Sequence, residues 1–145
     1  MKLKHLKHTE YLDFFAFDEE IFSSIPMFSD SVQAGFPSPA EDHMDMDLNL
    51  NDHLVQNPSA TFCVKAIGES MKDAGIQSGD IMIVDKSLQP KNRSIVLAVI
   101  DGEFTVKRVN INNRQLYLMP ENSDFSPIKI TEEMDFKVWG VVTYI

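Results

Sequence analysis

The chain has 145 residues, of which 43% are hydrophobic, a size and composition that suit one domain with a core of its own. Its formal net charge of −9 makes free nucleic acid a poor partner, because an acidic surface repels phosphates. The single cysteine excludes an intrachain disulfide, and no apolar run approaches the ~18 residues of a membrane span. We therefore expect a cytoplasmic protein that is neither exported nor anchored in a membrane.

Residues 1–46 are predicted to form an N-terminal arm. The apolar stretch at residues 11–22 predicts a short amphipathic helix, and its four acidic residues distinguish it from the core of a signal peptide. Pro37 and Pro39 stand two residues apart, which blocks both helix continuation and hydrogen-bond donation to a strand partner. Residues 29–40 are therefore expected to be extended and exposed.

Residues 47–145 are predicted to form a mainly β domain. A short helix is expected near residues 48–56 and is ended by Pro58. After it, short apolar runs alternate with turn residues at the spacing of an all-β domain. The seven expected strands are residues 60–67, 81–85, 94–100, 103–109, 115–119, 128–130 and 136–144.

Asp101 and Gly102 form a two-residue hairpin signal between two of these strands. With these two residues as the loop, the register places Val96 opposite Lys107 and Ala98 one pair closer to the loop. Side chains at these alternate positions share one face of the strand pair. Lys107 is therefore expected beside Val96 and Ala98, which is an apolar place for a lysine.

Apolar surroundings change the chemistry of Lys107. An unperturbed lysine has a pKa near ~10.4, and burial lowers that pKa because it disfavours the charged form. A neutral lysine can take a proton from a hydroxyl group. The alternative, which is the more common situation for a lysine, is that Lys107 faces solvent while Phe104 and Val106 supply the apolar face of the strand.

Ser70 is the candidate hydroxyl. It follows a predicted strand and Gly68, and it is expected to open a short helical turn whose unpaired backbone N–H groups can stabilise an oxyanion. The alternative is that Ser70 is an ordinary helix N-cap. The segment matches neither G-x-S-x-G nor S-x-x-K, since Lys72 stands two residues after the serine and does not face it on a helix.

Longer blocks of the sequence resemble one family. The blocks are residues 28–42, 58–71, 78–85 and 99–108, with a weaker match at residues 118–122. In this order they resemble the LexA-like self-cleaving serine peptidases and, within them, the UmuD group of SOS mutagenesis proteins. The resemblance covers residues 26–144, and blocks of this length are more specific than any short motif.

The resemblance implies a self-cleaving serine endopeptidase with a β domain of short twisted strands and a flexible N-terminal arm. Ser70 matches the nucleophile and Lys107 the general base, while the backbone N–H groups of Ser70 and Glu69 match the oxyanion hole. The bond between Ala34 and Gly35 matches the scissile bond, with alanine where UmuD proteins often have cysteine. The four histidines are scattered without the spacing of a zinc site, and neither a metal nor a cofactor is expected.

The same resemblance implies partners. The family's members are homodimers whose self-cleavage is stimulated by the RecA filament on single-stranded DNA, and the trimmed form joins a UmuC-type DNA polymerase for error-prone translesion synthesis. Residues 1–25 match nothing in the family and are too short for a repressor's DNA-binding domain, so no direct sequence-specific DNA binding is expected. A signal-peptidase-like enzyme would share the serine–lysine chemistry, but it would need a membrane anchor, and the sequence has no apolar run long enough for one. The remaining alternative is a non-enzymatic module that binds RecA or a polymerase and carries a vestigial dyad.

Overall fold

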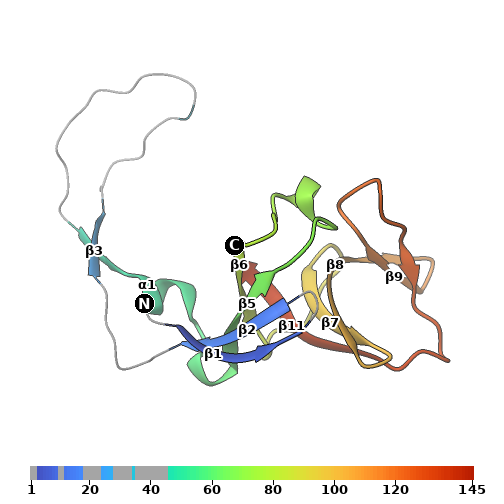
Figure 1. Cartoon of the computed structure of the whole chain (residues 1–145), viewed down its shortest axis with the longest axis horizontal. Helices are drawn as coiled ribbons and strands as arrows, with labels where there is room; N and C mark the ends of the chain where they lie inside the picture. The colour runs from blue at the N-terminus through green and yellow to red at the C-terminus, as the bar shows by residue number, and fades with distance from the viewer. Residues whose placement is uncertain (1–2, 10–11, 18–23, 28–33, 35–45) are drawn as a thin grey trace.

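The computed structural model describes residues 3–9, 12–17, 24–27, 34 and 46–145, and this part of the chain is mainly β (Figure 1). The elements in chain order are β1 (Leu3–His8), β2 (Leu12–Phe17), β3 (Ser24–Met27), β4 (Met46–Asn49), α1 (Leu50–Leu54), the 3₁₀ turn η1 (Pro58–Ala60), β5 (Thr61–Ala66), the 3₁₀ turn η2 (Lys72–Ala74), β6 (Ile81–Asp85), β7 (Ile95–Ile100), β8 (Glu103–Asn112), β9 (Gln115–Met119), β10 (Ile128–Lys129) and β11 (Phe136–Tyr144). The predicted fold class, the short helix before Pro58 and the seven predicted strands are confirmed. None of the described helices is long and apolar enough to cross a membrane.

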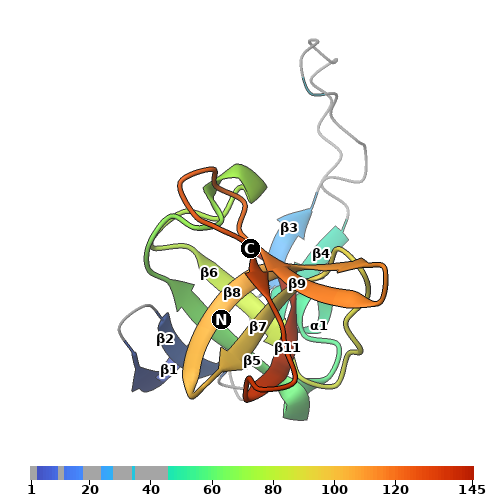
Figure 2. The ribbon, with the colours of Figure 1, turned by 90° about the vertical axis from the view of Figure 1, so that its right-hand side faces the viewer.

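Nine of the strands form one sheet in the order β1-β2-β5-β6-β11-β7-β8-β9-β10, and each neighbouring pair is antiparallel. The sheet curls, so that β8 comes round to face the side where β5 and β6 lie (Figure 2). Side chains from β5 and β8 consequently share one core cluster, although three strands (β6, β11 and β7) separate them in the sheet order. This curl brings the loop after β5 close to β8.

The hairpin of β7 and β8 has the predicted register. Val96 pairs with Lys107, and Ala98 pairs with Thr105. The loop residues Asp101 and Gly102 both have positive φ, 48° and 85°. A two-residue type I′ turn, which matches the twist of the two strands, requires positive φ at both loop residues. This requirement explains why the Asp-Gly dipeptide predicted the register correctly.

The predicted helix at residues 11–22 is wrong for the residues of that range that the structure describes. Residues 12–17 form β2, which pairs with β1 on one side and with β5 on the other. Leu12 and Phe14 are buried, and Asp13 and Phe15 are only partly covered, which is the two-residue alternation of a strand. The hairpin of β1 and β2 thus extends the main sheet, while the division of the chain at residue 46 stays a prediction.

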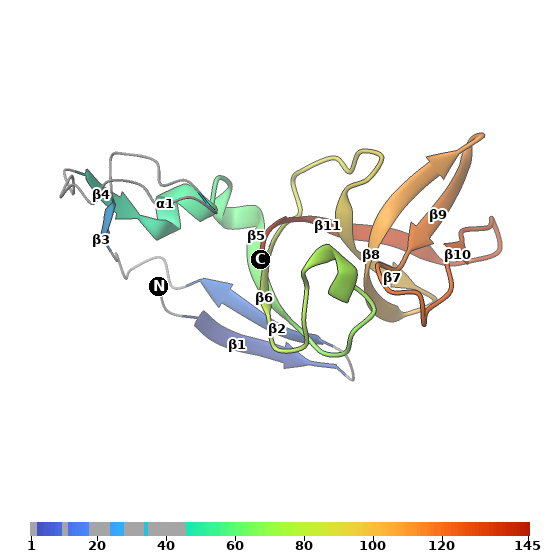
Figure 3. The same cartoon turned by 90° about the horizontal axis from the view of Figure 1, so that it is seen from above.

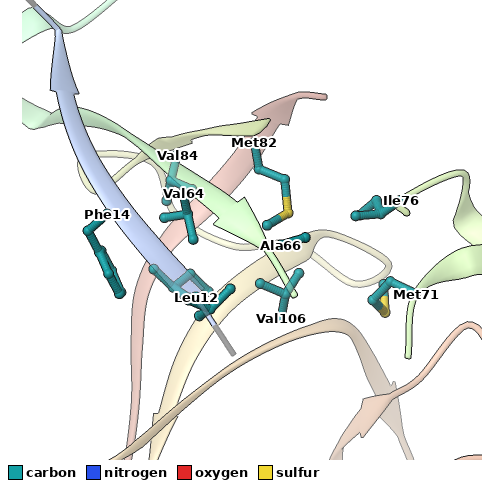
Figure 4. Packing of buried hydrophobic residues seen from close by; sticks show 10 residues of the cluster. Leu12, Phe14, Val64, Ala66, Met71, Ile76, Met82, Val84 and Val106 are labelled. Carbon is teal, nitrogen blue, oxygen red and sulfur yellow. The ribbon is translucent and has the colours of Figure 1, made fainter. Parts of the chain in front are cut away.

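The main core fills the inside of the curled sheet, where ten buried hydrophobic residues pack together (Figure 4). Strands β2, β5, β6, β7 and β8 supply most of them. Met71 and Ile76 come from the loop between β5 and β6, and both are 3% exposed. Because these two side chains are buried on either side of η2, the loop that carries Ser70 is fixed to the core rather than free at the surface.

Strands β3 and β4 form a separate two-stranded sheet that lies beside α1, away from the curled sheet (Figure 1). Met27 pairs with Met46, so the ends of the segment between these strands are held together. Ala34 belongs to that segment and is exposed. Gly35, the other residue of the predicted scissile bond, lies outside the described residues, as do all the other residues of the stretch predicted to be extended.

Candidate active site

The loop that carries Ser70 begins where β5 ends. Gly68 has a φ of 100°, a backbone conformation that residues with a side chain rarely adopt, and its N–H donates to Ser78 Oγ at 3.2 Å. Ser70 lies in the turn before η2, but the N-cap of η2 is Met71 and no side chain caps it. The alternative interpretation of Ser70 as a helix N-cap is therefore wrong.

A second segment, which follows β9, holds the same loop from the other side. The N–H of Glu121 donates to the Ser70 carbonyl, and the Glu121 carbonyl accepts from the N–H of Asp73, both at 2.8 Å. Asn122, which is 5% exposed, donates its side-chain N–H to the Glu69 carbonyl at 2.8 Å. The backbone on both sides of the Ser70 nitrogen is thus fixed by this segment.

An arginine ties that segment to β8. Arg108 Nε forms an ion pair with Glu121, and Arg108 Nη1 donates to the Arg93 carbonyl at 2.8 Å. Arg108 follows Lys107 directly in the sequence, so one strand carries both the lysine of the site and the anchor of the segment that holds Ser70. The sequence had singled out residues 118–122 only as a weak resemblance, and it gave no signal for the long-range contacts of Glu121 and Asn122.

Lys107 lies where the hairpin register placed it, and it is 8% exposed. Val96 and Ala98, its neighbours on the same face of the strand pair, are fully buried. No described carboxylate forms an ion pair with the ammonium group, and burial lowers the pKa of Lys107 below its ordinary value. The alternative that Lys107 faces solvent is therefore wrong.

Three oxygen atoms surround Lys107 Nζ. Ser70 Oγ lies at 3.1 Å, Thr105 Oγ1 at 2.8 Å and the Val106 carbonyl at 3.1 Å. A neutral amine has two N–H donors and one lone pair. The Val106 carbonyl can only accept a hydrogen bond and the Thr105 hydroxyl is free to accept the second, so the lone pair is left for the hydroxyl of Ser70. This arrangement lets Lys107 act as a base toward Ser70.

The predicted oxyanion-hole groups lie in the same turn. Among the described residues, the backbone N–H groups of Glu69 and Ser70 have no hydrogen-bond acceptor. Free N–H groups beside a nucleophile are what a developing oxyanion requires. Their role in an oxyanion hole stays a prediction.

Ser70 and Lys107 open into a cleft of about 610 Å³. Its walls are mostly apolar and come from both ends of the curled sheet, including Leu12, Phe104 and Ile128. A cleft of this size suits a few residues of an extended peptide. Ala34 is not among the residues that line it, and no three described His, Cys, Asp or Glu residues form a cluster that could hold a metal ion.

Comparison with known proteins matches residues 26–143 to the family described as Peptidase S24-like. The chain is 46% identical over 125 residues to protein SamA of Salmonella typhimurium, which covers 86% of each chain. It is 43% identical over 122 residues to protein MucA of Escherichia coli, which covers 83% of each. A LexA repressor of Bordetella parapertussis is 38% identical over 111 residues, which is 76% of this chain and 50% of the repressor. The family match includes Ser70 and Lys107 and begins after the β1–β2 hairpin.

Proposed function

The chain belongs to the S24-like peptidase family as a UmuD-like member, and we propose that it is a self-cleaving serine endopeptidase in which Ser70 is the nucleophile and Lys107 the general base. The observation that carries this proposal is the 3.1 Å contact between Lys107 Nζ and Ser70 Oγ in an apolar cleft. The bond that is cut joins Ala34 to Gly35. Residues 1–46 form the arm that carries this bond, and residues 47–145 form the catalytic and dimerisation domain.

The reaction proceeds through an acyl-enzyme. Neutral Lys107 takes the proton of Ser70 as Oγ attacks the Ala34 carbonyl carbon, and the N–H groups of Ser70 and Glu69 bind the oxyanion. The tetrahedral intermediate collapses, the bond to Gly35 breaks, and Lys107 gives its proton to the leaving amine. Lys107 then takes a proton from a water molecule as the water oxygen attacks the ester carbonyl carbon, and it returns that proton to Ser70 Oγ as the ester bond breaks, which restores the free serine and the neutral lysine.

Cleavage depends on bringing the arm to the cleft. Ala34 is exposed and lies outside the cleft lining, so either the arm of the same chain moves or the arm of a second copy enters. A tethered arm has a high effective concentration and needs little binding affinity. A RecA filament on single-stranded DNA then stimulates cleavage by favouring the state in which the arm is docked, which is a population shift.

The cleaved homodimer is proposed to serve as the accessory subunit of an error-prone, UmuC-type translesion polymerase in the cytoplasm. Residues 1–34 carry three lysines and six acidic residues, so their removal takes −3 from the net charge of −9 and leaves −6. A domain this acidic reaches DNA through a protein partner rather than by binding phosphates itself.

The test is the intact mass of the purified protein followed over time at neutral and alkaline pH, beside Ser70→Ala and Lys107→Ala. We expect fragments 1–34 and 35–145 from the unsubstituted chain and a loss of roughly 10²–10⁴-fold without the base. The rate should rise with pH and level off above the lowered pKa of Lys107, because only the neutral amine accepts the proton. Absence of cleavage at any pH, even with RecA, nucleotide and single-stranded DNA, would leave the non-enzymatic binding module as the better account.

A further inference from the structure

The β1–β2 hairpin is an addition to the peptidase sheet. It lies outside the residues that match the family, and it joins the sheet through one ladder, between β2 and β5 (Figure 3). In that ladder Leu12 pairs with Ala66 and Phe14 with Val64. Without the hairpin, β5 would be the edge of the sheet and would leave a row of backbone groups unpaired.

Two side chains of β2 anchor the hairpin in an apolar depression, which we call the hairpin seat. The seat is formed by Phe62, Val64, Ala66, Phe104, Val106 and Trp139. Phe14 is 5% exposed, and its ring stacks on Phe62 with centroids 6.1 Å apart and meets the edge of Phe104 at 4.9 Å. Leu12 is 4% exposed and also forms part of the wall of the cleft that holds Ser70.

Charged side chains complement these anchors. Asp13 stands opposite Lys65 in the register of the ladder, and its carboxylate contacts the His8 and His5 rings of β1, which links the two strands of the hairpin. Lys7 Nζ lies 5.5 Å from the centre of the Phe104 ring. Strand β1 carries the exposed Lys4 and Lys7 on the outermost edge of the sheet, where lysine discourages pairing with further strands.

Backbone pairing along an exposed strand together with pockets for alternate side chains is how proteins bind extended peptides by strand addition. We propose that the edge of β5 and the hairpin seat are a peptide-binding site of this kind, whose ligand is the chain's own β1–β2 hairpin. Cutting the arm therefore leaves the N-terminal fragment bound to the domain. The position of the cut rests on the proposed function, whereas the binding site does not.

The fragment of residues 1–34 has a second hold on the domain. It contains β3, which pairs with β4 from Ser24 opposite Asn49 to Met27 opposite Met46. The immediate product of cleavage is therefore a nicked complex, and release of the fragment is a separate step. Release uncovers the edge of β5, the hairpin seat and one wall of the cleft together.

The test uses the full chain with a recognition sequence for an added protease in place of residues 18–23, and with Ser70→Ala so that self-cleavage plays no part. This cut separates the hairpin from β3 and isolates the contribution of the β5 ladder. After the cut we expect the hairpin fragment to remain with the domain in native mass spectrometry and gel filtration at micromolar concentration. Hydrogen exchange should show that the amides of β5 keep their protection.

Matched variants separate the seat from the rest of the hairpin. Phe14→Ala should weaken retention of the fragment by about 100-fold or more, since truncating a buried phenylalanine is among the most costly core substitutions. Leu6→Ala should leave retention unchanged, because Leu6 is 56% exposed on β1. Circular dichroism of the uncut variants checks that each is folded.

Two results would overturn the proposal. One is immediate loss of the hairpin fragment from the chain that carries no substitution in the hairpin, with rapid exchange of the β5 amides. The other is equal retention by the Phe14→Ala and Leu6→Ala chains. Failure of the proposed self-cleavage would change neither readout, because the added protease makes the cut.

Discussion

The buried amide of Asn122 is predicted to position the nucleophile, and its removal should slow cleavage without unfolding the protein. Its side-chain N–H donates to the Glu69 carbonyl at 2.8 Å, and its oxygen accepts from the N–H of Asp124 at 3.0 Å. Asn122→Ala removes both hydrogen bonds. Neither reacting group is touched, so the effect on rate must pass through the backbone of the Ser70 loop.

The loss of stability in Asn122→Ala depends on whether the Glu69 carbonyl and the Asp124 N–H still have hydrogen-bond partners. The Glu69 carbonyl still accepts from the N–H of Lys72 at 3.2 Å, and the N–H of the exposed Asp124 can bind water. Each lost bond therefore costs about 0.5–1.5 kcal/mol rather than the full penalty of an unpaired buried group, and the variant should lose about 1–3 kcal/mol. Domains of ordinary stability remain folded after such a loss.

The cleavage rate should fall further than this loss of stability explains. A displacement of about 1 Å at a reacting group can cost about 10²-fold in rate, so we expect a decrease of roughly 10–100-fold. The assay is the appearance of fragment 35–145 by mass at several pH values, beside urea unfolding. The pH at which the rate levels off should not move, because the surroundings of Lys107 are intact.

The matched control is Asn110→Ala, which removes an exposed amide from β8 and should change neither quantity. Cleavage of Asn122→Ala at the unsubstituted rate, together with the expected loss of stability, would refute the positioning role. Asn122 would then be a structural residue alone. A shift in the pH profile would also count against the reasoning, because it would mean that the amide acts through Lys107.

Three further predictions concern buried groups. Lys107→Met should slow cleavage by roughly 10²–10⁴-fold, as loss of the base does, yet raise the free energy of unfolding at neutral pH by about 0.5–2 kcal/mol in urea melts. This gain in stability should shrink at alkaline pH. Burial lowers the pKa of Lys107, so the native state binds fewer protons than the unfolded state and the stability of the unsubstituted chain rises with pH. Burial alone would raise the pKa of Asp85, but hydrogen bonds from Ser87 and Asn57 outweigh it and lower the pKa. The carboxylate therefore stabilises the fold above its unfolded pKa, and this contribution is lost as pH falls through the folded pKa. Asp85→Asn should lower the free energy of unfolding by about 1–3 kcal/mol at pH 7 and change it little in acid. Gly140→Ala should cost about 1–3 kcal/mol in thermal unfolding, because its Cβ would lie 2.6 Å from Val84 Cγ1.

The elements that could be predicted from the sequence are those whose causes are local. The dipeptide Asp101-Gly102 fixes the loop of the β7–β8 hairpin, the loop fixes the register, and the register places Lys107 beside Val96 and Ala98. The register predicted apolar neighbours for the lysine, but a solvent-facing lysine stayed the more common alternative until the family resemblance was added. The pairing of Ser70 with Lys107 needed the family resemblance, because nothing local relates two residues 37 positions apart.

The parts that could not be predicted depend on distant partners. The apolar residues between positions 11 and 17 fit a helix as readily as a strand, and the ladder to β5, about 50 residues further along the chain, decides for the strand. The bond from Asn122 to Glu69 likewise spans 53 positions. Such contacts join segments that lie far apart in the sequence, so no local pattern predicts them.

The chain's single thiol, on Cys63, provides a way to measure how fast the ladder between β2 and β5 opens. Cys63 is 1% exposed, and Phe15 of β2 and Ile83 of β6 stand directly opposite it on the two neighbouring strands. Burial raises the pKa of Cys63 to about 12, so the folded chain holds no reactive thiolate at neutral pH. An alkylating reagent therefore reacts with Cys63 only after β2 has separated from β5. Because each molecule has one thiol, the fraction of alkylated chains measures how many chains have opened. The same burial keeps the thiol of one folded copy from forming a disulfide with that of another.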